Sequence, residues 1–121
     1  MSTPKRTVLI VDDEPTLLRL VETMLTTAGF DVTVALGGQE GLRLVECNTY
    51  ALVITDVRMP LVSGPEFARR MRYTNSPKLL FMSGASAEPV HELIRTGAGF
   101  IKKPFRKGEL LNAIQQLLPD Q

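Results

Sequence analysis

The sequence has one cysteine, few aromatic residues and no tryptophan, and none of its hydrophobic runs is long. The single cysteine, Cys47, excludes an internal disulfide and fits a reducing compartment. We expect Cys47 to be a half-buried apolar residue within a helix. No apolar run approaches the roughly 18 residues of a membrane span, and no signal-peptide core is present. The sequence therefore predicts a soluble, cytoplasmic protein that makes no membrane contact.

A strong net charge is also absent. The chain has 14 basic and 13 acidic residues, for a formal net charge of +1. This balance argues against direct nucleic-acid binding, which calls for a strongly basic face. The 121 residues, 44% of them hydrophobic, suit one globular domain. We predict a short polar tail over residues 1–6, one folded domain over 7–118 and a C-terminal tail over 119–121; the start Met1-Ser2-Thr3 favours a natural N-terminus.

Short apolar runs alternate five times with segments of helical periodicity, which predicts βαβ units and a parallel sheet. The expected strands are Thr7–Val11, Asp31–Ala35, Ala51–Thr55, Lys78–Met82 and Gly99–Lys102. The expected helices are 15–28, Gly38–Glu46, Gly64–Tyr73, Ala87–Thr96 and Arg106–Leu118, with Gly29 capping the first. Periodicity leaves the order of the strands open.

Acidic residues follow two of the apolar runs. Asp12 and Asp13 come after the first strand, and Asp56 comes after the third. At roughly 4 Å and an effective dielectric of about 20, each contact between like charges costs ~4 kcal/mol. A domain of this size is stable by only ~6–18 kcal/mol. Such a cluster therefore implies a bound divalent cation, and its hard oxygen ligands favour Mg²⁺.

From about Arg6 to about Leu118 the chain resembles the receiver domain of two-component response regulators. Several short motifs occur in the same order and at the same spacing as in that family. These motifs are Asp12-Asp13, Asp56, Met59-Pro60, Gly64, Ser83-Gly84-Ala85 and Lys103-Pro104-Phe105. The resemblance implies a single doubly wound (βα)5 flavodoxin-like α/β domain, with a five-stranded parallel sheet of order 2-1-3-4-5. This order places the first and third strands side by side and brings the three aspartates together.

The resemblance also implies roles for the acidic residues. Asp56 is the phosphoacceptor, since a carboxylate can attack phosphorus and hold the phosphoryl group as a mixed anhydride. Asp13 and Asp56 are direct Mg²⁺ ligands, Asp12 reaches the metal through water, and the backbone carbonyl of Arg58 completes the protein ligands. Asp13 and Glu14 also suit the positive end of the first helix.

Further residues of the resemblance complete the catalytic and switching set. Ser83 would hydrogen-bond the phosphoryl oxygens, and Lys103 would offset their charge. We select Lys103 over the adjacent Lys102 because it directly precedes Pro104, and we expect the Lys103–Pro104 peptide to be cis. The switch and interface residues are Phe100, Pro104 and Phe105; a core role for Phe100 remains the alternative.

The resemblance implies a sensor histidine kinase or a histidine phosphotransfer protein as partner, docking at Met59, Pro60 and Gly64. Phosphorylation would switch the face formed by the fourth helix, fifth strand and fifth helix, through which a homodimer is also expected. Such a protein is a switch rather than a conventional turnover enzyme.

Three alternatives compete with this interpretation. A small Mg²⁺-dependent phosphohydrolase with an aspartyl nucleophile would need a general acid two residues after Asp56, where Arg58 stands. A flavodoxin-like cofactor binder would need a glycine-rich phosphate loop after the first strand, where acidic residues stand. A docking-only receiver would lack part of the phosphorylation set. His91 faintly resembles a kinase phosphoacceptor, and we interpret it as a surface residue of the fourth helix.

Overall fold

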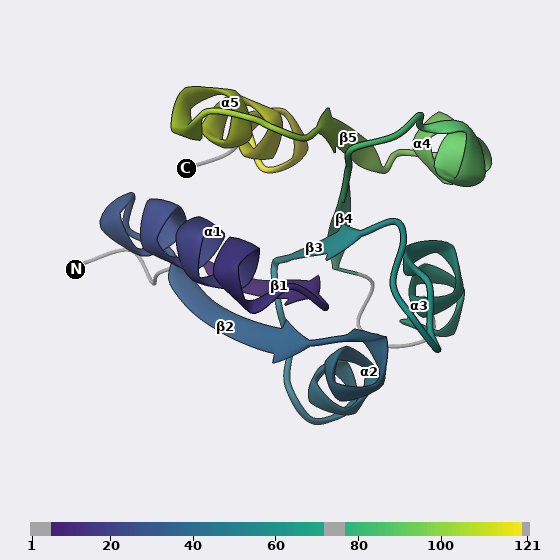
Figure 1. Ribbon diagram of the computed structural model, residues 1–121. Helices are drawn as coiled ribbons and strands as arrows, with labels where there is room; N and C mark the ends of the chain where they lie inside the picture. Colours follow the sequence, from purple (N-terminus) through teal and green to yellow (C-terminus); the bar gives the residue numbers. More distant parts are fainter. Residues whose placement is uncertain (1–5, 72–76, 120–121) are drawn as a thin grey trace.

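A computed structural model describes residues 6–71 and 77–119 as one parallel sheet between two layers of helices (Figure 1). The strands are β1 (Thr7–Asp12), β2 (Asp31–Leu36), β3 (Leu52–Asp56), β4 (Lys78–Ser83) and β5 (Gly99–Lys102). The helices are α1 (Pro15–Thr27), α2 (Gly38–Cys47), α3 (Gly64–Met71), the 3₁₀ turn η1 (Glu88–Val90), α4 (His91–Arg95) and α5 (Lys107–Leu117).

The strand order is β2-β1-β3-β4-β5, and each strand pairs in parallel with its neighbours. The predicted flavodoxin-like order is therefore confirmed. In the centre of the sheet Val11 lies opposite Thr55, so the residues that follow them on β1 and β3 reach the same edge. The order reverses between β1 and β3, which is where ligands bind in open sheets of this kind.

Alternate residues of the central strands point to opposite faces of the sheet. Val8 and Ile10 of β1 pack in one core with residues of α1 and α5. Leu9 and Val11 pack in a second core with residues of α2 and α3. A smaller third cluster joins Phe81 of β4 to Val90 beside α4. Figure 1 shows the same division, with α1 and α5 on one side of the sheet and α2, α3 and α4 on the other.

The first helix begins at Pro15 as predicted and ends at Thr27, with the predicted cap at Gly29. Pro15 occupies its first turn, where the missing N–H is not needed. Gly29 follows its end with φ +99°, and the N–H groups of Gly29 and Phe30 donate to the carbonyls of Thr26 and Leu25. This is a Schellman cap, which a left-handed glycine makes at little steric cost.

The fourth helix differs from its prediction. Instead of one helix over Ala87–Thr96, the chain forms η1 followed by five residues of α4. Pro89 is tolerated in the first turn but cannot continue a helix begun earlier. The helix ends at Arg95, with Thr96 as its C-cap and Gly97 following in a left-handed conformation with φ +123°. As predicted, His91 is an exposed residue of this helix.

Cys47, the last residue of α2, is exposed, so the prediction of a half-buried cysteine was wrong: the end of the helix turns it toward solvent. The predicted C-terminal end of the third helix at Tyr73 lies outside the described residues. Among the described residues, none of the helices has the length and apolarity that crossing a membrane requires.

Candidate functional site

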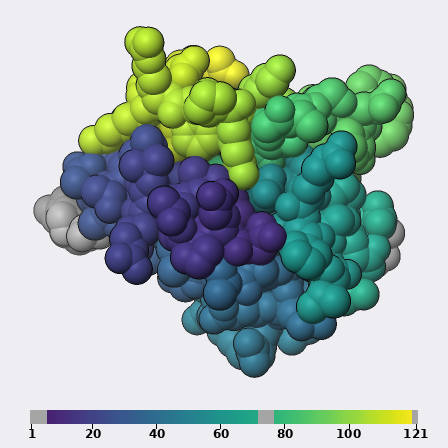
Figure 2. Space-filling model, viewed as in Figure 1, coloured from purple at the N-terminus to yellow at the C-terminus, as the bar shows by residue number. Residues whose placement is uncertain are grey.

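The carboxyl edge of the sheet gathers the predicted site residues. Asp12, Asp56 and Ser83 are the last residues of β1, β3 and β4. One carboxylate oxygen each from Asp12, Asp13 and Asp56 lies within 4.8 Å of the other two. The parallel register of β1 and β3 explains why residues 44 positions apart meet here. The face seen in Figure 2 shows the N-terminal segment (purple), the segment after β3 (teal) and the segment after β5 (yellow-green) lying side by side.

A single lysine bridges two of these carboxylates. Lys103 Nζ lies 3.4 Å from Asp12 Oδ2 and 3.3 Å from Asp56 Oδ2. Both aspartates are buried, whereas Asp13 is exposed. Lys102 is exposed beside Lys103, in agreement with its interpretation as a solvated residue.

The pKa of Asp12 reflects the charges and the burial of the cluster. Burial raises the pKa of Asp12 to about 6; Lys103 opposes the shift, and the Asp56 carboxylate adds to it. The Asp12 Oδ1 atom accepts a hydrogen bond of 3.0 Å from the Glu14 N–H, which favours the charged form. One lysine therefore compensates three carboxylates incompletely. A divalent cation with oxygen ligands fits both the geometry and the charge of this site.

Ser83 is held at the same edge. Its hydroxyl oxygen accepts a hydrogen bond of 3.0 Å from the Ala85 N–H, and its side chain is buried. Its carbonyl accepts a bond of 2.8 Å from the Lys103 N–H, which joins the ends of β4 and β5. The Lys103–Pro104 peptide is cis, as predicted.

The loop after Asp56 closes on the backbone of Asp56. The Gly64 N–H donates a bond of 2.9 Å to the Val57 carbonyl. A Cβ at position 64 would overlap the Asp56 carbonyl oxygen, so only glycine permits this approach. Of the three predicted docking residues, Pro60 is exposed, whereas Met59 and Gly64 are buried.

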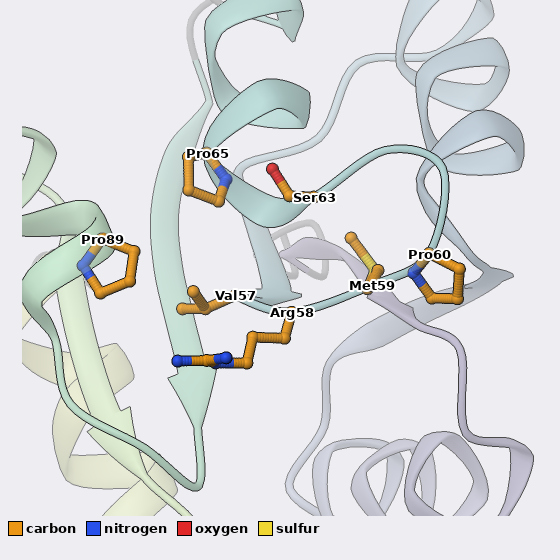
Figure 3. Close-up of a pocket in the computed structure, with 7 residues that line it drawn as sticks. All are labelled: Val57, Arg58, Met59, Pro60, Ser63, Pro65 and Pro89. Atoms are coloured by element: carbon orange, nitrogen blue, oxygen red, sulfur yellow. The ribbon is translucent and has the colours of Figure 1, made fainter.

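A groove of about 580 Å³ runs beside this loop (Figure 3). Its lining consists of Val57, Arg58, Met59, Pro60, Ser63, Pro65 and Pro89. Figure 3 shows Arg58 extending from the loop toward the side on which Pro89 lies. Arg58 is exposed, and no ion pair is found for it within residues 6–71 and 77–119. Sequence reasoning did not find this groove, although its three prolines mark both walls.

The remaining predicted residues lie on two neighbouring surfaces. Phe100 on β5 is half-buried opposite Phe81 and packs with the third cluster. Pro104 and Phe105 line a second groove of about 390 Å³, together with Leu20 and other residues of α1. Leu20 is 51% exposed, whereas Leu18, Val21 and Leu25 of the same helix are buried.

A family model described as the response regulator receiver domain matches residues 8–115. The chain belongs to this family. Receiver domains are signalling switch domains that are phosphorylated in two-component systems and interact with histidine kinases.

Individual proteins of this family are similar to the chain in sequence and in structure. The response regulator ArlR of Staphylococcus saprophyticus is 32% identical over 116 residues, which cover 94% of this chain and 53% of that protein. The uncharacterized transcriptional regulatory protein YkoG of Bacillus subtilis is 36% identical over 114 residues, which cover 92% of this chain and 50% of that protein. This receiver domain therefore spans about half the length of the curated relatives that it matches. The chemotaxis response regulator CheY4 of Vibrio cholerae has a solved structure with a TM-score of 0.86 at 30% identity, covering 94% of this chain and 99% of that chain.

Proposed function

We propose that this receiver domain is a phosphorylation switch in which Asp56 accepts a phosphoryl group from a phosphohistidine. The donor is a sensor histidine kinase or a histidine phosphotransfer protein. The observation that carries the proposal is the position of Asp56, with a carboxylate oxygen beside both the Lys103 ammonium and the Asp12–Asp13 pair. A carboxylate oxygen forms the new O–P bond as the N–P bond to the donor imidazole breaks, and the imidazole leaves with the electron pair of that bond.

Mg²⁺ would be held by Asp13, Asp56 and the backbone carbonyl of Arg58, with Asp12 reaching it through water. When bound, the ion neutralises charge on the transferring phosphoryl group. The three clustered carboxylates and their incomplete compensation by Lys103 support this ligand set.

Lys103 and Ser83 complete the proposed phosphoryl site. The Lys103 ammonium already lies against Asp56 and can follow the charge to a phosphoryl oxygen. The Ser83 hydroxyl, which accepts a hydrogen bond from Ala85, keeps its own proton available for a phosphoryl oxygen.

The output part of the proposal concerns the face formed by α4, β5 and α5. Capture of the phosphoryl group by Ser83 and Lys103 would shift β5, and with it the half-buried Phe100, in a population shift between two arrangements. We also propose that the protein forms a homodimer through this face, to which Pro104 and Phe105 contribute. Its proposed location is the cytoplasm. Pro60 would contact the kinase directly, whereas buried Met59 and Gly64 would shape the loop that presents it.

The experiment is phosphorylation by a small donor. Incubation with acetyl phosphate and Mg²⁺ should add one acid-labile phosphoryl group, measured by intact-mass spectrometry. Asp56→Asn should abolish the addition. Asp31→Asn is the matched control, because Asp31 is an exposed aspartate at the start of β2, and the site lies at the carboxyl ends of the strands. Equal labelling of Asp56→Asn and wild type would overturn the assignment.

A further inference from the structure

Leu61 stands at the centre of an unusual turn in the loop after Asp56. The Val62 N–H donates a hydrogen bond of 2.7 Å to the Pro60 carbonyl, and Leu61 between them has φ +70°. This is the strained form of the γ-turn, with a positive φ at its centre. Leu61 is the one residue other than glycine with a positive φ among residues 6–71 and 77–119.

The side chain of Leu61 is as unusual as its backbone. It is 88% exposed, the highest value among the exposed large hydrophobic residues of the described ranges; Leu36 and Leu20 follow at 55% and 51%. A glycine would accept this backbone conformation without steric conflict and would present no apolar surface to water. Neither the backbone nor the side chain of Leu61 therefore serves the isolated fold. A strained residue in the loop that follows a reactive group is an observation from which a functional role can be inferred.

The loop geometry keeps Leu61 close to the phosphoacceptor. The loop starts at Val57 and returns to it through the hydrogen bond from Gly64. Leu61 is three residues from Gly64, so their Cα atoms are at most about 11 Å apart. Gly64 itself packs on the Asp56 carbonyl. Leu61 is therefore anchored to the rim of the site.

Transfer from a phosphohistidine requires the donor protein to cover this rim. Asp56 is 8% exposed, so the imidazole that carries the phosphoryl group must enter from the carboxyl edge of the sheet. A standard interface buries about 800 Å² on each partner, which corresponds to a disc of roughly 16 Å radius. Because Gly64 packs on Asp56 and Leu61 lies within about 11 Å of Gly64, an interface of that size centred on Asp56 reaches Leu61.

On the basis of the proposed function, we infer that Leu61 is a specificity-determining contact for the protein phosphodonor. Its isobutyl group enters an apolar depression on the phosphohistidine protein, next to the histidine. The γ-turn fixes the direction of the side chain before binding, which lowers the entropy lost on contact. The contact belongs to the donor surface and plays no part in the chemistry at Asp56.

The test compares two donors that transfer the same group from the same kind of bond. One is a purified histidine kinase, autophosphorylated and chosen from a panel as the kinase that labels the wild-type domain fastest. The other is phosphoimidazole, which has the N–P bond but no protein surface. The variants are Leu61→Gly, which removes the side chain and the strain, Leu61→Ala, which removes the side chain and keeps the strain, and Leu61→Met, which keeps an apolar side chain.

We expect Leu61→Gly and Leu61→Ala to slow transfer from the kinase roughly five- to twenty-fold at subsaturating concentration, as truncation of an interface anchor does. Leu61→Met should retain most of the rate, and all three should match wild type with phosphoimidazole. The urea midpoint of Leu61→Gly should equal or exceed that of wild type, which shows that the loss is not one of folding.

The outcomes separate this inference from the proposed function. Equal kinase rates for wild type and both truncations would overturn the role of Leu61 while leaving Asp56 as phosphoacceptor. A parallel loss with phosphoimidazole would also overturn it, since Leu61 would then shape the site. If neither donor labels wild type at Asp56, the proposed function fails, and the inference fails with it.

Discussion

Lys103 Nζ lies 3.4 Å from Asp12 Oδ2, although the two residues are 91 positions apart in the chain. The contact joins the first strand to the segment after the last, across β3 and β4. Lys103 also contacts Asp56, so one ammonium is shared between two buried carboxylates. Lys103 therefore holds the cluster together, but its single positive charge does not neutralise the three carboxylates. The shortage of positive charge and the loop after Asp56 both have consequences that can be measured.

The first prediction concerns pH in the absence of metal. The pKa of Asp12 rises from its ordinary value of 3.8 to about 6 on folding. The folded state then binds a proton more tightly than the unfolded state. The free energy of unfolding should therefore fall as pH rises from about 4 to about 6, by of the order of 3 kcal/mol in total, at about 1.4 kcal/mol per pH unit. Above about pH 6 it should no longer change through Asp12.

The measurement is urea unfolding in EDTA across this pH range. Asp12→Asn is the control because it cannot titrate, and subtracting its curve removes the contribution of the carboxylates that do not interact with Asp12. If the two curves run parallel between pH 4 and pH 6, Asp12 is not the titrating group.

The second prediction concerns Mg²⁺ and Asp56. The Asp56 carboxylate is repelled by the carboxylates of Asp12 and Asp13 and attracted by the Lys103 ammonium. The attraction offsets about one of the two repulsions. Asp56→Asn should therefore raise the free energy of unfolding in metal-free buffer by about 1–2 kcal/mol. Mg²⁺ at ten times its Kd should stabilise the wild type by about 1.4 kcal/mol. Thermal melts of both proteins with EDTA or Mg²⁺ measure these effects. A wild-type melting temperature that ignores Mg²⁺ argues against a metal site here.

The third prediction concerns Gly64. In Gly64→Ala the new methyl group overlaps the Asp56 carbonyl, so the backbone of the phosphoacceptor must move. We expect a loss of about 2–4 kcal/mol in unfolding free energy and slower labelling by acetyl phosphate. Gly108→Ala is the matched control, because nothing lies within 4 Å of a Cβ there. This control should be neutral or stabilise α5 by about 0.5–1 kcal/mol. Comparable stability of the two variants in urea would show that the loop yields easily.

The sequence predicted the elements well because their signals are local. Pro15 and Gly29 mark the ends of α1 by steric preference alone, and the apolar runs mark the strands. Strand order is a non-local property, and it came from the resemblance to receiver domains rather than from periodicity. The division of the fourth helix into η1 and α4 was missed because apolar spacing is insensitive to a 3₁₀ turn at Pro89.

The site was predicted as a set of residues but not as a shape. Asp12, Asp56 and Lys103 were identified together, and their contacts are present in the structure. The turn at Leu61 could not be predicted, since a leucine gives no signal for a positive φ. The groove beside Arg58 was also missed, because it is formed by segments that come together only in the folded chain.

The last prediction concerns the lifetime of the phosphoryl group. Arg58 is exposed two residues after Asp56 and extends over the groove beside the site (Figure 3). Its guanidinium can fork onto phosphoryl oxygens and exclude the in-line water, or it can stabilise charge in the hydrolytic transition state. Hydrolysis requires a water in contact with phosphorus, and the small side chain of Ala85, two residues after Ser83, can exclude little water, so we expect exclusion by Arg58 to dominate. Arg58→Ala should then shorten the half-life in Mg²⁺ several-fold. Arg70→Ala is the matched control, because Arg70 is an exposed arginine paired with Glu66 on α3. Half-lives are measured after removal of the donor, and a half-life of Arg58→Ala equal to or longer than that of wild type would show that Arg58 does not shield the anhydride.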